Sequence, residues 1–87
     1  MNFHPSIEPP DEPDPALGRV LQRLREQRGL SPAELAAQAE VEEAALSGIE
    51  AGTADPPWTT VEAIAAALEV SVESIASAVL AEDRNAP

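Results

Sequence analysis

The chain has 87 residues, which suffice for one small domain with a single hydrophobic core. Sixteen acidic residues against five arginines and no lysine give a net charge of −11, which favours basic partners over nucleic acid or an anionic membrane. The absence of cysteine excludes disulfides and thiolate metal sites, and no segment reaches the about 18 apolar residues of a membrane span. The N-terminus lacks the pattern of a signal peptide, so we expect a cytoplasmic protein.

The two ends of the chain are predicted to lie outside the domain. Residues 1–15 contain five prolines and four acids, with too few large apolar side chains to offset the entropy of ordering, so a disordered acidic tail is expected there. His4 lies in this tail without a second imidazole, and we expect neither a metal nor a cofactor. The domain is predicted at residues 16–80, with a net charge of −6, and a flexible tail at residues 81–87.

Apolar residues recur at helical spacing through the domain, and nothing in the pattern indicates a strand. The first predicted helix ends at Gly29. A second helix begins at Pro32, because Ser31 and Glu34 have the spacing of a capping box. The inward stripe of the first helix consists of Leu17, Val20, Leu21 and Leu24, and that of the second consists of Leu35, Ala36 and Ala39.

Three further helices are predicted in the second half of the chain. One runs from about Glu42 to Glu50 and ends at Gly52. The next covers about residues 57–68, and Ser71 caps a short fifth helix. The fold class is therefore all-α, with five short helices in one compact domain. The apolar sides consist of Leu46 and Ile49, then Trp58, Val61, Ile64, Ala65 and Leu68, then Val72, Ile75 and Val79.

Small, polar and apolar anchor residues occur together at a specific spacing across residues 17–79: Leu17-Gly18, Arg25, Gly29-Leu30-Ser31, Leu35-Ala36, Val41, Ile49-Glu50, Gly52, Pro56, Ala65, Leu68, Val70-Ser71 and Ile75. In these anchors the chain resembles the Cro/C1-type helix-turn-helix family (XRE, lambda-repressor-like). The resemblance implies a five-helix lambda-repressor-like domain and a DNA-binding transcriptional regulator that reads the major groove with the third helix, about residues 42–50. It also implies a structural ion pair between Arg25 and Glu50.

The resemblance further implies where DNA or another partner would be contacted. Base contacts map to the third helix and supporting contacts to its neighbours, so the candidate residues are Pro32, Glu42, Glu43, Ala44, Ser47, Gly48 and Thr53. A glutamate can accept a hydrogen bond from cytosine N4, and an alanine can contact the thymine methyl group. Two adjacent acids without a neighbouring cation nevertheless depart from the family pattern, and acids in a first helical turn also simply favour the helix dipole.

Other positions depart from the family as well. At most Arg19, Arg23 and Arg28 are free to meet phosphate, and a solvated face is the simpler interpretation. Glu40 occupies the turn position where the family commonly has glycine, which costs roughly 1 kcal/mol if the left-handed conformation is kept. At the position of Trp58 the family usually has an aliphatic core residue, so we expect this large side chain to fill the core. The alternative is a surface anchor for a partner.

Three functions are compared on this basis. The first is the DNA-binding regulator. The alternative is an acidic helix-turn-helix scaffold that contacts a basic protein and binds DNA weakly or not at all. An enzyme is disfavoured, because the sequence offers neither a nucleophile with a base nor a phosphate-binding loop. A homodimer through the fifth helix is also considered, although the same side chains could simply close the core: Val72, Ile75, Val79 and Leu80.

Overall fold

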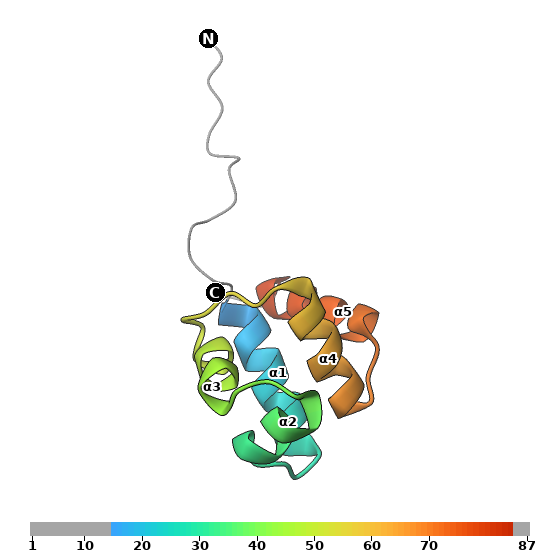
Figure 1. Cartoon of the computed structure of the whole chain (residues 1–87). Helices are drawn as coiled ribbons and strands as arrows, with labels where there is room; N and C mark the ends of the chain where they lie inside the picture. Colours follow the sequence, from blue (N-terminus) through green and yellow to red (C-terminus); the bar gives the residue numbers. More distant parts are fainter. Residues whose placement is uncertain (1–14, 85–87) are drawn as a thin grey trace.

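In the computed structural model, residues 15–84 are described, with side chains up to Glu82, and this part of the chain folds into five helices without a strand (Figure 1). The all-α prediction is therefore confirmed. The expected N-terminal tail, including His4, lies outside the described residues apart from Pro15. The helices are α1 (Pro15–Gln27), α2 (Pro32–Ala39), α3 (Glu43–Ala51), α4 (Trp58–Leu68) and α5 (Val72–Arg84).

The helix ends follow local sequence signals. The Oγ of Ser31 accepts a hydrogen bond from the Glu34 amide at 3.0 Å, and the Glu34 carboxylate accepts one from the Ser31 amide at 2.8 Å. This is the predicted capping box at the start of α2. The Oγ of Ser71 likewise accepts from the Ser74 amide at 3.0 Å and caps α5. These side chains satisfy amides that a helix start leaves without intrahelical partners.

Two glutamates end helices in the left-handed conformation. Glu40 has a φ of 60° at the end of α2, and Glu69 has a φ of 61° at the end of α4. In each case the backbone amide still donates to carbonyls of the preceding turn. The left-handed conformation considered for Glu40 is thus present. Because Glu40 and Glu69 both have a side chain, the steric cost of this conformation arises at two positions.

The fifth helix is longer than expected. It continues to Arg84, whereas the sequence predicted that order fades after about Leu80. The reason is an ion pair that the sequence did not reveal: the Glu82 carboxylate accepts hydrogen bonds from Arg19 Nε at 2.9 Å and Arg23 Nη1 at 3.1 Å. These contacts attach the end of α5 to α1. Of the tail predicted at residues 81–87, only residues 85–87 remain outside the described helix.

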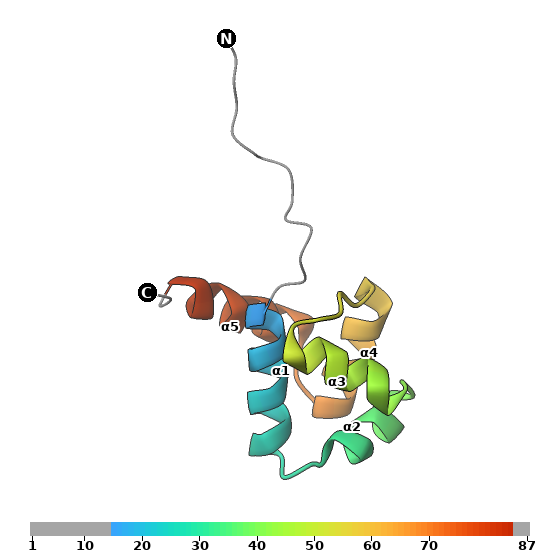
Figure 2. The same ribbon diagram turned by 90° about the vertical axis from the view of Figure 1, so that its left-hand side faces the viewer.

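The core is built from buried side chains of all five helices. α1 packs against both α3 and α5, while α2 packs against α3 and α4 (Figures 1 and 2). Small residues let the helices approach closely, as at Gly18, where a side chain would collide with the Ile49 and Glu50 carbonyl oxygens. The largest fully buried side chains are Val20, Leu21, Leu35, Leu46, Ile64 and Leu68.

Trp58 does not fill the core, and that expectation was wrong. The residue begins α4 and is 60% exposed. Its Nε1 donates a hydrogen bond to the Glu62 carboxylate at 3.0 Å, one turn further along the same helix. The indole thereby satisfies its donor on the outside of the helix. Only the later residues of α4 reach the core: Val61, Ile64, Ala65 and Leu68.

Taken singly, none of the helices in residues 15–84 has the length and apolar character to cross a membrane. α4 and the part of α5 up to Glu82 meet those criteria only as a pair, and their axes are bent by 102°.

Candidate nucleic-acid interface

The predicted contact residues on α3 are accessible. The side chains of Glu42, Glu43, Ala44 and Ser47 are exposed, and Gly48 is half-buried. These residues span the cap and the first turn and a half of α3. Because Leu46 and Ile49 point inward and are buried, the opposite side of the helix faces solvent. In Figure 2, α3 lies across the front of the domain, above α2.

The two candidate residues outside α3 occupy different positions. Pro32 is the half-buried first residue of α2. Thr53 is exposed in the loop after α3, and its Oγ1 donates a hydrogen bond to the Gly48 carbonyl at 3.2 Å. The same carbonyl accepts from the Thr53 amide at 2.9 Å, so this part of the loop is fixed to the last turns of α3. The structure thus joins Thr53 to the α3 surface.

The start of α3 is acidic and lacks a side-chain cap. Glu42 is the N-cap residue, but its side chain makes no capping hydrogen bond, and Glu43 follows in the first turn. The amides at a helix start attract anions, because they have no intrahelical acceptors. Two carboxylates at the same end partly offset that attraction for a phosphate. A ligand that binds these amides would therefore lie close to two negative charges.

No cation lies in residues 31–53, which comprise α2, the turn, α3 and the start of the next loop. Of the five glutamates there, Glu34 is held in the capping box and Glu50 in an ion pair. The other three are exposed and have no ion pair within the described structure: Glu40, Glu42 and Glu43. We refer to these three residues as the acidic face.

The arginines do not compensate for the acidic face. Arg19 and Arg23 share Glu82, and Arg28 Nη2 lies 3.1 Å from Glu69 Oε1. Arg25 pairs with Glu50, so every arginine whose side chain is described has a carboxylate partner. The three arginines that could at most have met phosphate are therefore partly neutralised within the domain. Sequence analysis missed Glu82 as a partner, although residues 72–84 contain no glycine or proline that would end the helix at Leu80.

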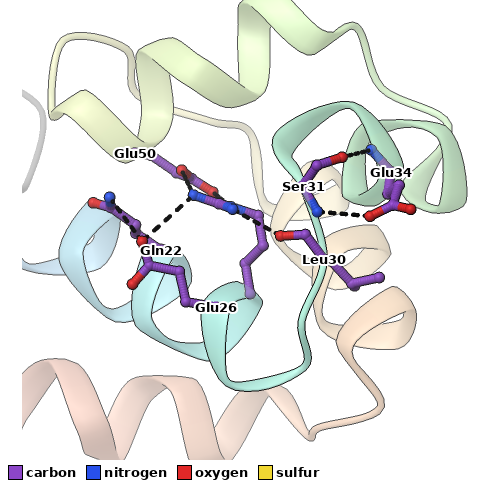
Figure 3. A network of polar contacts seen from close by, with 7 residues as sticks. Gln22, Glu26, Leu30, Ser31, Glu34 and Glu50 are labelled. Atoms are coloured by element: carbon purple, nitrogen blue, oxygen red, sulfur yellow. Dashed lines mark hydrogen bonds and ion pairs between the residues drawn. The ribbon is translucent and has the colours of Figure 1, made fainter.

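A buried ion pair fixes the position of α3. Arg25 Nε and Nη2 donate hydrogen bonds to the Glu50 carboxylate at 2.9 and 3.1 Å, and Nη1 donates to the Leu30 carbonyl at 2.8 Å (Figure 3). Both charged side chains are 9% exposed. The hydrogen bond to Glu50 raises the pKa of Arg25, although burial opposes the shift. One guanidinium thus connects α1, the loop before α2 and the last turn of α3.

The described residues offer little for other chemistry. They contain no group of three histidine, aspartate or glutamate side chains that could hold a metal ion. They also enclose no pocket for a small molecule. The outer surface of α3 and the loop that follows it are accessible in this domain.

Comparison with known proteins agrees with this geometry. Residues 16–78 match the model of a family described as a helix-turn-helix domain. One similar solved structure is that of SinR, the master regulator for biofilm formation, in complex with DNA. Its sequence is 33% identical to this chain, the match covers 69% of this chain and 97% of SinR, and the TM-score is 0.65. No curated protein is similar enough in sequence to count as a relative.

Two further solved structures share the fold. The clp gene regulator ClgR from C. glutamicum is 26% identical, with 79% of this chain and 90% of that chain covered and a TM-score of 0.75. The wild-type restriction-modification controller protein C.Esp1396I is 22% identical, with coverages of 83% and 94% and a TM-score of 0.77. At this identity the second likeness concerns the fold alone.

Proposed function

This chain belongs to the helix-turn-helix domain family, and we propose that it regulates transcription by binding DNA with α3 in the major groove. The observation that carries the proposal is the exposed outer surface of α3, held on a domain that resembles a regulator crystallised with DNA. The buried Arg25–Glu50 pair supports it, because a reading helix must be held in one orientation. The chain is not an enzyme, and the proposed role places it in the cytoplasm.

The chemistry of the α3 surface suggests what it would read. Glu42 and Glu43 can accept hydrogen bonds from cytosine N4, Ala44 can contact a thymine methyl group, and Ser47 can bond to several base edges. Gly48 contributes only backbone to this surface, because a side chain there would lie against Thr53 and Ala54. Thr53 and the helix start at Pro32 would adjoin phosphates. Since this surface has no cation, we expect weak non-specific binding.

A homodimer would let the regulator cover two half-sites. We propose α5 as the contact, and the exposed side chain of Leu80, at 60%, supports this. The other residues considered for the contact serve the domain itself, since Ile75 is buried and Val72 and Val79 pack against the core. The apolar area left for a dimer is therefore smaller than the sequence suggested.

A second function is favoured by one specific observation. Among the side chains that the structure describes, those of the acidic face have no ion pair, while every arginine has one. This arrangement suits a basic protein as the partner of α3, with DNA bound weakly or not at all. The fold would then act as a scaffold for protein contact.

The two functions can be separated by NMR. The labelled full chain is titrated with a mixed-sequence duplex, starting at low salt, where phosphate contacts are strongest. The regulator function predicts amide shifts concentrated in residues 42–47 and at the start of α2, fading as salt rises. Selection from a random duplex library then gives the site. Glu43→Ala should change the selected sequence, whereas the control Glu73→Ala on α5 should not.

Absence of any shift, together with absence of any selected sequence, would overturn the regulator function. The scaffold function predicts instead that Glu42→Lys with Glu43→Lys strengthens general DNA binding and abolishes capture of a basic protein. Capture that survives this double charge reversal would exclude α3 as the contact surface.

A further inference from the structure

The N-terminal segment joins the domain beside the end of the proposed reading helix. α1 begins at Pro15, and a Cβ placed on Gly52, the residue that ends α3, would lie 3.3 Å from the Cα of Pro15. One turn later, Gly18 packs against the Ile49 and Glu50 carbonyls. Figure 2 shows the first turn of α1 directly beside the last turn of α3. The chain therefore enters the described domain beside the C-terminal end of α3.

The segment before Pro15 is strongly acidic. Residues 1–14 contain four carboxylates and neither lysine nor arginine, a net side-chain charge of −4. Consecutive Cα atoms lie about 3.8 Å apart, so the backbone of Asp14 is within about 4 Å of Pro15 and that of Asp11 within about 15 Å in any conformation. The Debye length is about 10 Å at 0.1 M salt and about 30 Å at 0.01 M. Chain connectivity alone thus keeps several of these charges in electrostatic reach of α3.

We infer that residues 1–14 act as an electrostatic brake on DNA binding, an inference that rests on the proposed function. A phosphate backbone laid along α3 meets these charges together with the negative end of the α3 dipole. Every duplex is penalised alike, because the repulsion involves phosphates rather than bases. The segment therefore suppresses non-specific binding and leaves discrimination to the base contacts of α3.

The test removes the charges and keeps the segment. The full chain is compared with the variant Glu8→Gln, Asp11→Asn, Glu12→Gln and Asp14→Asn in duplex-binding titrations at several salt concentrations. We expect the neutral variant to bind about tenfold more tightly at roughly 20 mM salt and about twofold more tightly at roughly 150 mM. The order of preference among duplexes should stay the same.

A matched pair of single substitutions separates the position of a charge from the net charge. Asp14→Asn and Glu73→Gln each remove one negative charge, but α5 begins on the side of the domain away from α3 (Figure 1). We expect about a twofold gain in affinity at low salt for Asp14→Asn and a clearly smaller gain for Glu73→Gln.

Each other result has a defined meaning. Equal gains from Asp14→Asn and Glu73→Gln would overturn the brake, because net charge alone would then account for the effect. Equal binding by the full chain and the neutral variant would overturn the brake and leave DNA binding intact. If neither form bound any duplex even at low salt, both the DNA-binding function and the brake would be overturned.

Discussion

Arg25 and Glu50 form an ion pair with two hydrogen bonds that joins the last turn of α1 to the last turn of α3, and both side chains are almost completely shielded from solvent. The remaining guanidinium nitrogen, Nη1, donates a hydrogen bond to the Leu30 carbonyl. No buried side-chain polar atom in the described residues lacks a partner. The pair is therefore costly to break from either side, since each charge depends on the other.

Removing either partner should destabilise the domain, and removing Arg25 should cost more. Glu50→Gln leaves the guanidinium with Leu30 and with Glu26, whose carboxylate lies 3.9 Å away. Arg25→Met strands the Glu50 charge and also removes the donor to Leu30, so we expect a loss of about 3–5 kcal/mol in the free energy of unfolding. Urea denaturation measures both values.

A double variant provides the control for this prediction. Arg25→Met combined with Glu50→Leu removes both charges, so it should cost less than Arg25→Met alone. A loss below about 0.5 kcal/mol for Arg25→Met would show that the pair does not hold the two helices together.

Sequence reasoning succeeds here where the signals are local. Ser31 and Glu34 fix the start of α2 through bonds between neighbouring residues, and apolar spacing places the buried sides of all five helices. The same spacing indicates which side of α3 faces solvent. It fails for Glu82, because the partners of this carboxylate lie 59 and 63 residues away and depend on how α5 crosses α1.

Trp58 illustrates a second limit of the sequence. Its size and spacing favoured the core, but it stands at the first residue of α4, where the inward face of the helix has not yet reached the packed interior. The hydrogen bond to Glu62 then favours an outward indole. For the candidate site, the sequence reveals the missing cations of α2 and α3, whereas the pairing of Arg19, Arg23 and Arg28 required the tertiary structure.

Glycine at the two left-handed positions should stabilise the domain. Glu40→Gly removes the steric cost of a side chain at φ 60°, and we expect a gain of about 0.5–1 kcal/mol in the free energy of unfolding. Glu69→Gly should gain less, because it also removes the exposed ion pair with Arg28. Thermal and urea denaturation give both values.

The control for these two glycines is alanine, which keeps the strain. Glu40→Ala should give no gain, and Gly29→Ala, at φ 71° with open space around the added Cβ, should lose stability through backbone strain alone. Equal gains from glycine and alanine at position 40 would instead point to charge as the cause.

The Glu82 pair predicts a specific dependence of stability on pH. Arg19, and then Arg23, lower the pKa of Glu82 from its ordinary value of 4.5 through hydrogen bonds to the carboxylate. A carboxyl group whose pKa is lowered in the folded state stabilises that state at pH values above its ordinary pKa. This contribution is lost as the pH falls through the lowered pKa. Glu82→Gln should therefore melt at a lower temperature than the native chain at pH 7.

The difference between Glu82→Gln and the native chain should disappear at acidic pH, once the native carboxylate is protonated. Glu73→Gln removes an acid of α5 that has no ion pair in the described structure, so its effect should not follow this pattern. Hydrogen exchange in residues 81–84 should also accelerate in Glu82→Gln, because the end of α5 loses its attachment to α1. A melting difference that is independent of pH would contradict the assignment to Glu82.

The close approach of α1 to α3 predicts that Gly18 tolerates no side chain. A Cβ at this position would lie 2.7 Å from the Glu50 carbonyl oxygen and closer still to that of Ile49, and both are backbone atoms that cannot rotate away. Gly18→Ala should thus separate the helices and weaken the Arg25–Glu50 pair. Overpacking of this kind costs about 1–3 kcal/mol, and over most of this range it exceeds the roughly 1 kcal/mol that alanine gains over glycine inside a helix.

Gly48→Ala in α3 is the matched control for Gly18→Ala. Its added Cβ would meet only side-chain atoms, Ala54 Cβ at 3.1 Å and Thr53 Oγ1 at 3.6 Å, so the small shift required should roughly cancel the gain in helix propensity. Urea denaturation of both variants gives the comparison. Gly18→Ala as stable as the native chain would mean that α1 and α3 lie further apart in solution, and Pro15 would then lie further from α3 as well.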